Sequence, residues 1–349
     1  MGVVRGPGNH CHDGDSINTV VGQFMIGTGI ANVLGMLPGC PNPECSVNLK
    51  GEVKESRTPG GTSGGSGPDS GWIVRFGFYW RKSDSRHIQR FFCKGCKKVF
   101  SAATHHPCFG QKKRRVNAPL ERLFSSGVSM RRAARLLGIH QITVARKLKF
   151  LAQQARASQE RFLEMCVEKH GLIRNAQFDE METFEHTKCK PLSIALIVDE
   201  KHRWIVGANV ARMPAKGLLA EISRKKYGLR EDKRPEAAKE TLSKAAGCLH
   251  PKVEILSDSN PHYPSWLRTQ LPSAIHKTVI SRRGCVTGQG ELKKIGLDPL
   301  FSLNHTAAMV RANINRMFRK TWCTTKRPES LLDQLAIYIN YHNRVLVGL

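Results

Sequence analysis

Two pairs of cysteines, far apart in the chain, place the strictest limit on how it can fold. One pair lies in CPNPEC and the other in FFCKGCKKVF, and the residues are Cys40, Cys45, Cys93 and Cys96. In the second pair, Lys94 and Gly95 allow a tight turn that lets both sulfurs face one ion. Four thiolates at such spacings predict one structural Zn²⁺ with tetrahedral geometry. With the strand-like segment between the pairs, they predict a zinc ribbon over residues 39–110.

The segment between the two pairs contains the stretch SRTPGGTSGGSGPDSG, residues 56–71. Its composition is that of a flexible linker, and we interpret it as an expanded loop of the ribbon. The alternative is that the four residues are unrelated buried thiols. The chain has eleven cysteines, an odd number, and no visible secretory signal, which favours a reducing cytoplasm over disulfide bonds.

Residues 1–38 precede the first cysteine pair and are expected to form a poorly structured leader. They include the uncharged apolar stretch from Ile17 to Leu37, which is interrupted by glycines and polar residues and lacks a basic flank. This pattern argues against a membrane span or a signal peptide. We therefore expect no membrane partner.

The net charge of the chain indicates a polyanionic partner. Lys and Arg number 55 against 28 Asp and Glu, which gives a formal net charge of +27. Such an excess is typical of proteins that bind the phosphates of nucleic acids. Binding to a membrane surface would require a long amphipathic basic helix, and the sequence has no such stripe.

A helix-turn-helix module is predicted over residues 111–157. Apolar residues recur there at helical spacing, namely Ala134, Leu137, Ile139, Val144 and Leu148. Gly138 lies where the turn between two helices requires a positive φ. An ordinary helical hairpin with solvated charges is the alternative.

The second helix of this module, at about residues 140–150, is expected to enter the major groove of double-stranded DNA. Gln141 and Arg146 would then reach base edges. The side chains expected to bind phosphates of the DNA backbone are Lys112, Lys113, Arg114, Arg115, Arg131, Arg132, Lys147 and Lys149.

The remainder of the chain shows the element order of a ribonuclease H-like domain over residues 176–349. A connecting helix over 158–175 precedes three consecutive strands, and helices alternate with strands after them. Two long helices, at about 303–321 and 328–345, close the chain. The fold class predicted for the whole chain is therefore α+β multidomain, with a zinc ribbon, a helix-turn-helix and an α/β catalytic domain.

An acidic cluster in this basic chain indicates a metal site. The stretch QFDEMETFE carries four carboxylates, and Asp179 lies in the first strand of the last domain while Asp258 ends the fourth. These strands are neighbours in a ribonuclease H-like sheet, so the two carboxylates would repel each other unless a divalent cation lay between them. Glu182 and Glu185 are interpreted as solvated rim charges. A merely solvated sheet edge is the alternative.

These motifs together resemble a bacterial DDE transposase of the insertion-sequence-one family or a near relative. The resemblance runs from Cys40 to the end of the chain through the cysteine pairs, the helix-turn-helix, DEMETF, SDSNPHY and LNHTAAMVRANINRMFRKTW. It implies metal-dependent cleavage and transfer of DNA strands with two Mg²⁺ or Mn²⁺ ions per active site. The implied partners are the terminal inverted repeats of the element and target DNA, bound by a homo-oligomer in the bacterial cytoplasm.

The same resemblance implies a third metal ligand at the start of the helix that leads to Arg319-Lys320-Thr321. This place falls on Asn304, where the family usually has Glu, and an amide oxygen can bind Mg²⁺ without adding charge. Asn304 could instead be a helix N-cap, in which case Asp298 is the nearby acid. The resemblance also implies that Arg311 binds a DNA phosphate. A DNA-binding regulator and an inactive transposase are the alternative functions.

Overall fold

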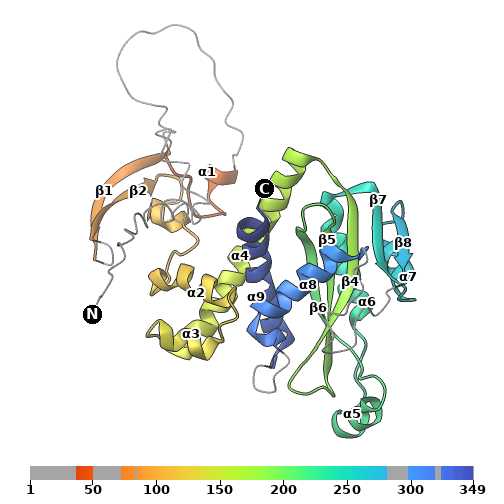
Figure 1. Ribbon diagram of the computed structural model, residues 1–349. Coiled ribbons are helices and arrows are strands. Elements are labelled where there is room, and N and C mark those ends of the chain that lie inside the picture. Colours follow the sequence, from red (N-terminus) through yellow and green to blue (C-terminus); the bar gives the residue numbers. More distant parts are fainter. Residues whose placement is uncertain (1–36, 50–71, 83–84, 281–297, 319–323, 349) are drawn as a thin grey trace, which may run out of the picture. The chain divides into compact units, whose positions relative to one another are not determined.

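The structure is a computed structural model that describes residues 37–49, 72–82, 85–280, 298–318 and 324–348. The chain divides into two compact units, Met1–Lys112 and Lys113–Leu349, and each is described by itself (Figure 1). Three predictions fall outside the described residues. They are the leader predicted over 1–38, of which the structure describes only residues 37 and 38, the Gly/Ser loop over 56–71 and the basic segment 319–321.

The first unit is a small sheet joined to two cysteine-bearing turns. Strands β1 (Ile73–Arg81), β2 (Arg86–Cys93) and β3 (Val99–Ser101) form an antiparallel sheet in that order. The short helix α1 (Ser46–Leu49) follows the first cysteine pair. Besides the cysteines, the buried core holds Ile73, Phe91 and Phe100. So small an apolar core would contribute little to folding by itself.

The second unit begins with three helices, α2 (Asn117–Phe124), α3 (Met130–Leu136) and α4 (Gln141–His170). Ser129 and His140 cap the second and third, because their side chains accept hydrogen bonds from backbone N–H groups of the first turns. Gly138 between them has a φ of +59°, as the sequence predicts. The buried side chains at this junction include Leu120, Phe124, Ala133, Val144 and Leu148.

Helix α4 is longer than either helix expected in this region. It runs without interruption for 30 residues and ends at Gly171, so the expected recognition helix and connecting helix are one element. Its second half packs on the central sheet through Phe162, Leu163 and Cys166. An ion pair of 2.7 Å between Arg156 and Asp333 also ties it to the last helix.

A mixed sheet of five strands forms the centre of the second unit. The strands are β4 (Ile173–Phe184), β5 (Pro191–Asp199), β6 (Ile205–Arg212), β7 (Leu249–Asp258) and β8 (Ile275–Val279). Their order is β6-β5-β4-β7-β8, with β4 antiparallel to β5 and parallel to β7. The first and fourth strands are therefore neighbours, as the sequence predicts.

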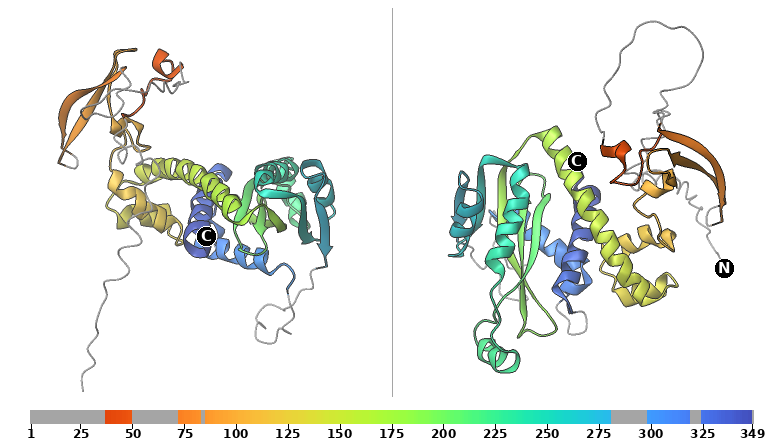
Figure 2. Two further views of the ribbon diagram at one scale, coloured as in Figure 1. Left: turned by 90° about the horizontal axis from the view of Figure 1, so that it is seen from above. Right: turned by 180° about the vertical axis from the view of Figure 1, so that it is seen from behind.

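Helices cover both faces of this sheet (Figure 1, Figure 2). One face packs against α4, α6 (Arg234–Ala245) and α7 (Tyr263–Gln270). The other packs against α8 (Phe301–Asn313) and α9 (Pro328–Tyr341). Helix α5 (Leu219–Tyr227) follows β6.

The last helices are shorter than expected. Helix α8 ends at Asn313 because Ile314 adopts an extended backbone, and a 3-10 turn (Asn315–Met317) follows. Helix α9 passes into a π-helical segment (His342–Val347). The apolar side chains of α8 and the segment after it, Leu303, Val310, Ile314 and Met317, are all buried.

Candidate active site and cysteine cluster

Asp179 and Asp258 lie at the same place on two neighbouring parallel strands. The pairing of β4 with β7 brings Phe178 opposite Ser257, and each aspartate is the next residue along its strand. Both side chains are half-buried. The fold thus brings together two carboxylates that lie far apart in the sequence.

The carboxylate of Asp179 is held by two donors. Its Oδ1 atom accepts hydrogen bonds from the backbone N–H of Glu180 at 2.6 Å and from the hydroxyl of Tyr263 at 2.9 Å. Tyr263 begins α7 and is 1% exposed, with its ring edge-on to Phe178 at 5.0 Å between centroids. Tyr263 is not predicted from the sequence as a site residue, although it is the last residue of the motif SDSNPHY.

The electrostatic surroundings of Asp179 favour the arrival of a positive charge. Burial raises the pKa of its carboxyl group, and the nearby Asp258 raises it further. The donors from Glu180 and Tyr263, and the positive charge of Arg311, lower that pKa but do not cancel the effect of burial. A cation bound between the two carboxylates would relieve both their desolvation and their repulsion.

Gln177 attaches the start of α8 to the strand that carries Asp179. Its side-chain oxygen accepts from the N–H of Leu303 at 2.9 Å, and its side-chain nitrogen donates to the carbonyl of Pro299 at 2.9 Å. Helix α8 has no side-chain cap of its own, because its N-cap residue is Leu300. An amide from β4 therefore replaces the missing cap and fixes the helix beside the aspartates.

Asn304 lies in the first turns of α8 and is exposed. The alternative that it caps the helix is wrong, since Leu300 occupies the N-cap position. Its side-chain nitrogen donates a 2.9 Å hydrogen bond to Asp298, the other candidate for the third ligand. That bond leaves the amide oxygen as the atom that could bind a cation. Arg311, two turns later on the same helical face, acts electrostatically on Asp179.

The other acids of the cluster have separate roles. Glu180 accepts a 2.6 Å hydrogen bond from Ser193 and lies near Arg234, so it belongs to a buried polar group. Glu182 forms an exposed pair with Lys216 at 2.7 Å, as expected of a rim charge. The same interpretation is wrong for Glu185, whose side chain is 13% exposed and pairs with Arg230 at 3.3 Å.

The donor set around Asp179 fits a hard divalent cation. Two carboxylates and an amide oxygen are ligands that Mg²⁺ and Mn²⁺ accept, and such ions complete their shells with water. One oxygen of Asp179 is already hydrogen-bonded, which leaves Oδ2 as the atom for a metal.

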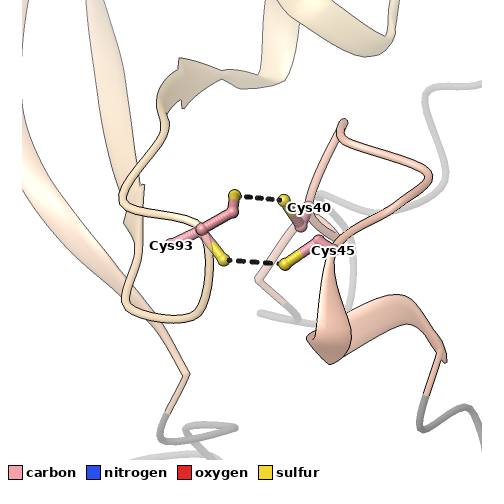
Figure 3. Close-up of side chains that lie close together, drawn as sticks. Cys40, Cys45 and Cys93 are labelled. Atoms are coloured by element: carbon pink, nitrogen blue, oxygen red, sulfur yellow. Dashed lines mark hydrogen bonds between the residues drawn. The ribbon is translucent and has the colours of Figure 1, made fainter.

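The four predicted zinc ligands converge in the first unit, and Figure 3 labels three of them, Cys40, Cys45 and Cys93. The sulfurs of Cys40 and Cys96 are 3.5 Å apart and those of Cys45 and Cys93 are 3.6 Å apart, and all four lie within 4.8 Å of one another. A tetrahedral zinc site with bonds of about 2.3 Å requires sulfurs about 3.8 Å apart. None of the four forms a disulfide. Their geometry therefore fits one Zn²⁺ ion.

Most of the predicted DNA-binding residues are on the surface of the described chain. The exposed members are Lys112, Lys113, Arg114, Arg115, Arg131, Arg132, Gln141, Arg146 and Lys149. Arg311 is half-buried, and Lys147 is only 6% exposed, on the side of α4 that also buries Val144 and Leu148. The expectation that Lys147 binds a phosphate is therefore wrong. In the described residues, no helix has the length and apolar character of a membrane span.

Comparisons with known proteins give only remote likenesses. No protein-family model and no curated protein matches the chain. Among solved structures, the Mos1 strand transfer complex matches with a TM-score of 0.21 and 14% identity over 66% of this chain and 77% of that chain. The catalytic domain of Mos1 mariner transposase matches with a TM-score of 0.22 and 14% identity over 54% of this chain and 88% of that chain. At these TM-scores the likeness carries no argument about the function of this chain.

Proposed function

We propose that the protein is a transposase of a bacterial insertion sequence that binds the ends of its element and cleaves and transfers DNA strands. The observation that carries this proposal is the position of Asp179 and Asp258 at matching places on paired parallel strands. A half-buried pair of like charges needs a partner, and a basic chain with a two-carboxylate site is suited to phosphoryl transfer.

Each site residue has a proposed role. Asp179 through Oδ2, Asp258, and Asn304 through its amide oxygen would hold two Mg²⁺ or Mn²⁺ ions. Such ions, when bound, polarise a phosphoryl oxygen and make water or a 3′-hydroxyl a stronger nucleophile. Arg311 would bind a phosphate of the same DNA strand, and Tyr263 would hold Asp179 in place. The four-cysteine cluster would hold one structural Zn²⁺.

The residues around the start of α4 are proposed to recognise the element ends as a helix-turn-helix. Gln141 and Arg146 are exposed at the first turns of a capped helix, where a groove-binding helix carries its base contacts. The exposed basic residues 112–115 and the arginines of α3 would hold the DNA backbone. Simultaneous binding of two ends and a target would require a homo-oligomer.

A cleavage assay tests this function. Full-length protein is incubated with a duplex that carries the inverted repeats flanking its gene, with Mg²⁺ and then with EDTA. We expect Mg²⁺-dependent nicking at the repeat, and Asp258→Ala should bind the same duplex without cutting it. Wild-type protein that binds the repeat and never cuts it, with Mg²⁺ or Mn²⁺, would indicate a regulator or an inactive transposase instead.

A further inference from the structure

One face of the small sheet in the first unit carries a row of aromatic side chains on the surface. Strand pairing defines the two faces, because Ile73, Phe91 and Phe100 point to the cysteine core and alternate residues point away from it. We call the second side the outer face. It is formed by Phe76, Tyr79, Ile88, Arg90, Phe92 and Val99.

The outer face exposes much more apolar surface than an isolated surface residue would. Phe76 is 46% exposed, Tyr79 is 37% exposed and Val99 is 43% exposed. The rings of Phe76 and Phe92 lie 5.8 Å apart between centroids. A contiguous surface of this kind marks a binding site.

Arginines are placed among these rings. The guanidinium of Arg90 lies 5.3 Å from the centre of the Phe76 ring, in a cation–π contact. Of the four arginines in the three strands, Arg81, Arg86 and Arg90 lie on the outer face, and Arg75, which pairs with Phe91, lies on the other face. No carboxylate in these strands offsets them, so the charge complements a polyanion.

The combination of ring faces and arginines favours unpaired bases over a duplex. The faces of bases inside a duplex are stacked on one another and cannot reach a flat protein surface. In a single strand each base offers a free face to an aromatic ring, while arginines follow the phosphates. Aromatic and arginine side chains also occur in protein interfaces, but these strands carry arginines and no acidic residue, which favours phosphates.

We propose that the outer face binds single-stranded DNA by stacking bases on Phe76 and Tyr79 beside Arg90. This surface is distinct from the duplex-binding helices of the proposed function. Its biological setting rests on that function, since cleavage and transfer of strands produce unpaired DNA. Binding of single-stranded DNA to the outer face can be tested without any DNA cleavage.

The test measures the affinity of the full-length protein for a fluorescent oligothymidine, for an abasic oligonucleotide of the same length and for a duplex. Each stacked base contributes about 1–3 kcal/mol. Phe76→Ala and Tyr79→Ala should therefore each weaken oligothymidine binding by about 5- to 150-fold. Both should leave duplex binding unchanged, and Phe76→Tyr should retain binding because it keeps a ring.

Phe78→Ala is the matched control. Phe78 is 60% exposed on the same strand, but its pairing with Gln89 places it on the opposite face from Arg90. Bound zinc and the circular dichroism spectrum show that each variant is folded. The proposal is overturned by equal affinity for the abasic strand, by full affinity in Phe76→Ala and Tyr79→Ala, or by an equal loss in Phe78→Ala. Failure of duplex cleavage with base-dependent binding intact would overturn the proposed function alone.

Discussion

The side-chain amide of Asn304 donates a hydrogen bond of 2.9 Å to the carboxylate of Asp298. The two residues that compete for the role of third metal ligand are therefore partners, and the amide nitrogen is occupied by this bond. Its oxygen is then oriented by Asp298. We infer that Asp298 positions Asn304.

Substitutions of Asn304 and Asp298 test which of these two residues binds the metal ion. Asn304→Ser keeps a polar side chain but is too short to reach a cation held by the aspartates, so we expect loss of Mg²⁺-dependent cleavage with repeat binding unchanged. Asp298→Ala should reduce cleavage less, because the amide itself remains. Full cleavage by Asn304→Ser would exclude Asn304 as a ligand and transfer that role to Asp298.

Tyr263→Phe should weaken metal binding without disturbing the core. The change keeps the buried ring against Phe178 and removes only the hydroxyl that donates to Asp179. Loss of a side chain that orients a ligand usually weakens metal affinity by about 10- to 100-fold. We expect the Mg²⁺ concentration for half-maximal cleavage to rise by a similar factor, while the rate at saturating Mg²⁺ falls less. An unchanged Mg²⁺ dependence would show that the hydroxyl is not needed to hold Asp179.

Asp179→Asn should stabilise the metal-free protein near neutral pH. Burial raises the pKa of Asp179 above its usual value of 3.8, so the folded protein binds this proton more tightly than the unfolded chain does. The stabilisation that protonated Asp179 gives to the folded protein is present at low pH. It is lost as the pH rises through the pKa that Asp179 has in the folded protein. In EDTA, the melting temperature of Asp179→Asn minus that of wild type should therefore increase from pH 4 to pH 7. A difference that shrinks over this range would contradict the sign of the shift.

Variants of the basic residues should distinguish base recognition from phosphate binding. Arg146→Ala is expected to relax the preference at one base pair of the repeat, at a cost of about 1–3 kcal/mol. Arg115→Ala should weaken binding to all duplexes and make the dependence on salt less steep. Lys149→Ala removes another exposed basic side chain of α4 and serves as a comparison with Arg146→Ala. Identical footprints and salt slopes for all variants would show that this surface does not bind DNA.

The cysteine cluster should bind one zinc ion per chain. Cys96→Ser is expected to release the metal and unfold the first unit, because a small metal-binding module obtains much of its folding free energy from the ion. Elemental analysis measures the metal. Cys108→Ser, a change at a buried cysteine outside the cluster, should leave the zinc content at one. Native protein without zinc would refute the assignment.

The parts of this site that could be predicted from sequence are those fixed by the order and period of the strands. Asp179 and Asp258 follow from two strands that must be neighbours in such a sheet. Tyr263 could not be predicted, because its contact with Asp179 depends on how α7 packs over β4. Glu185 was misassigned for a similar reason, since its partner Arg230 comes from a distant loop.

The unbroken course of α4 also has a consequence for where DNA is cut. A helix of 30 residues is about 45 Å long, which equals the rise of about 13 base pairs. Under the proposed function its first turn reads the sequence while its last turn is fixed to the sheet that carries Asp179. The length of the helix then sets the distance along the DNA between the recognised bases and the reacting phosphate. Adding a turn to α4 would move its first turn by about 5 Å relative to the sheet, and contacts such as the Arg156–Asp333 ion pair would then have to change.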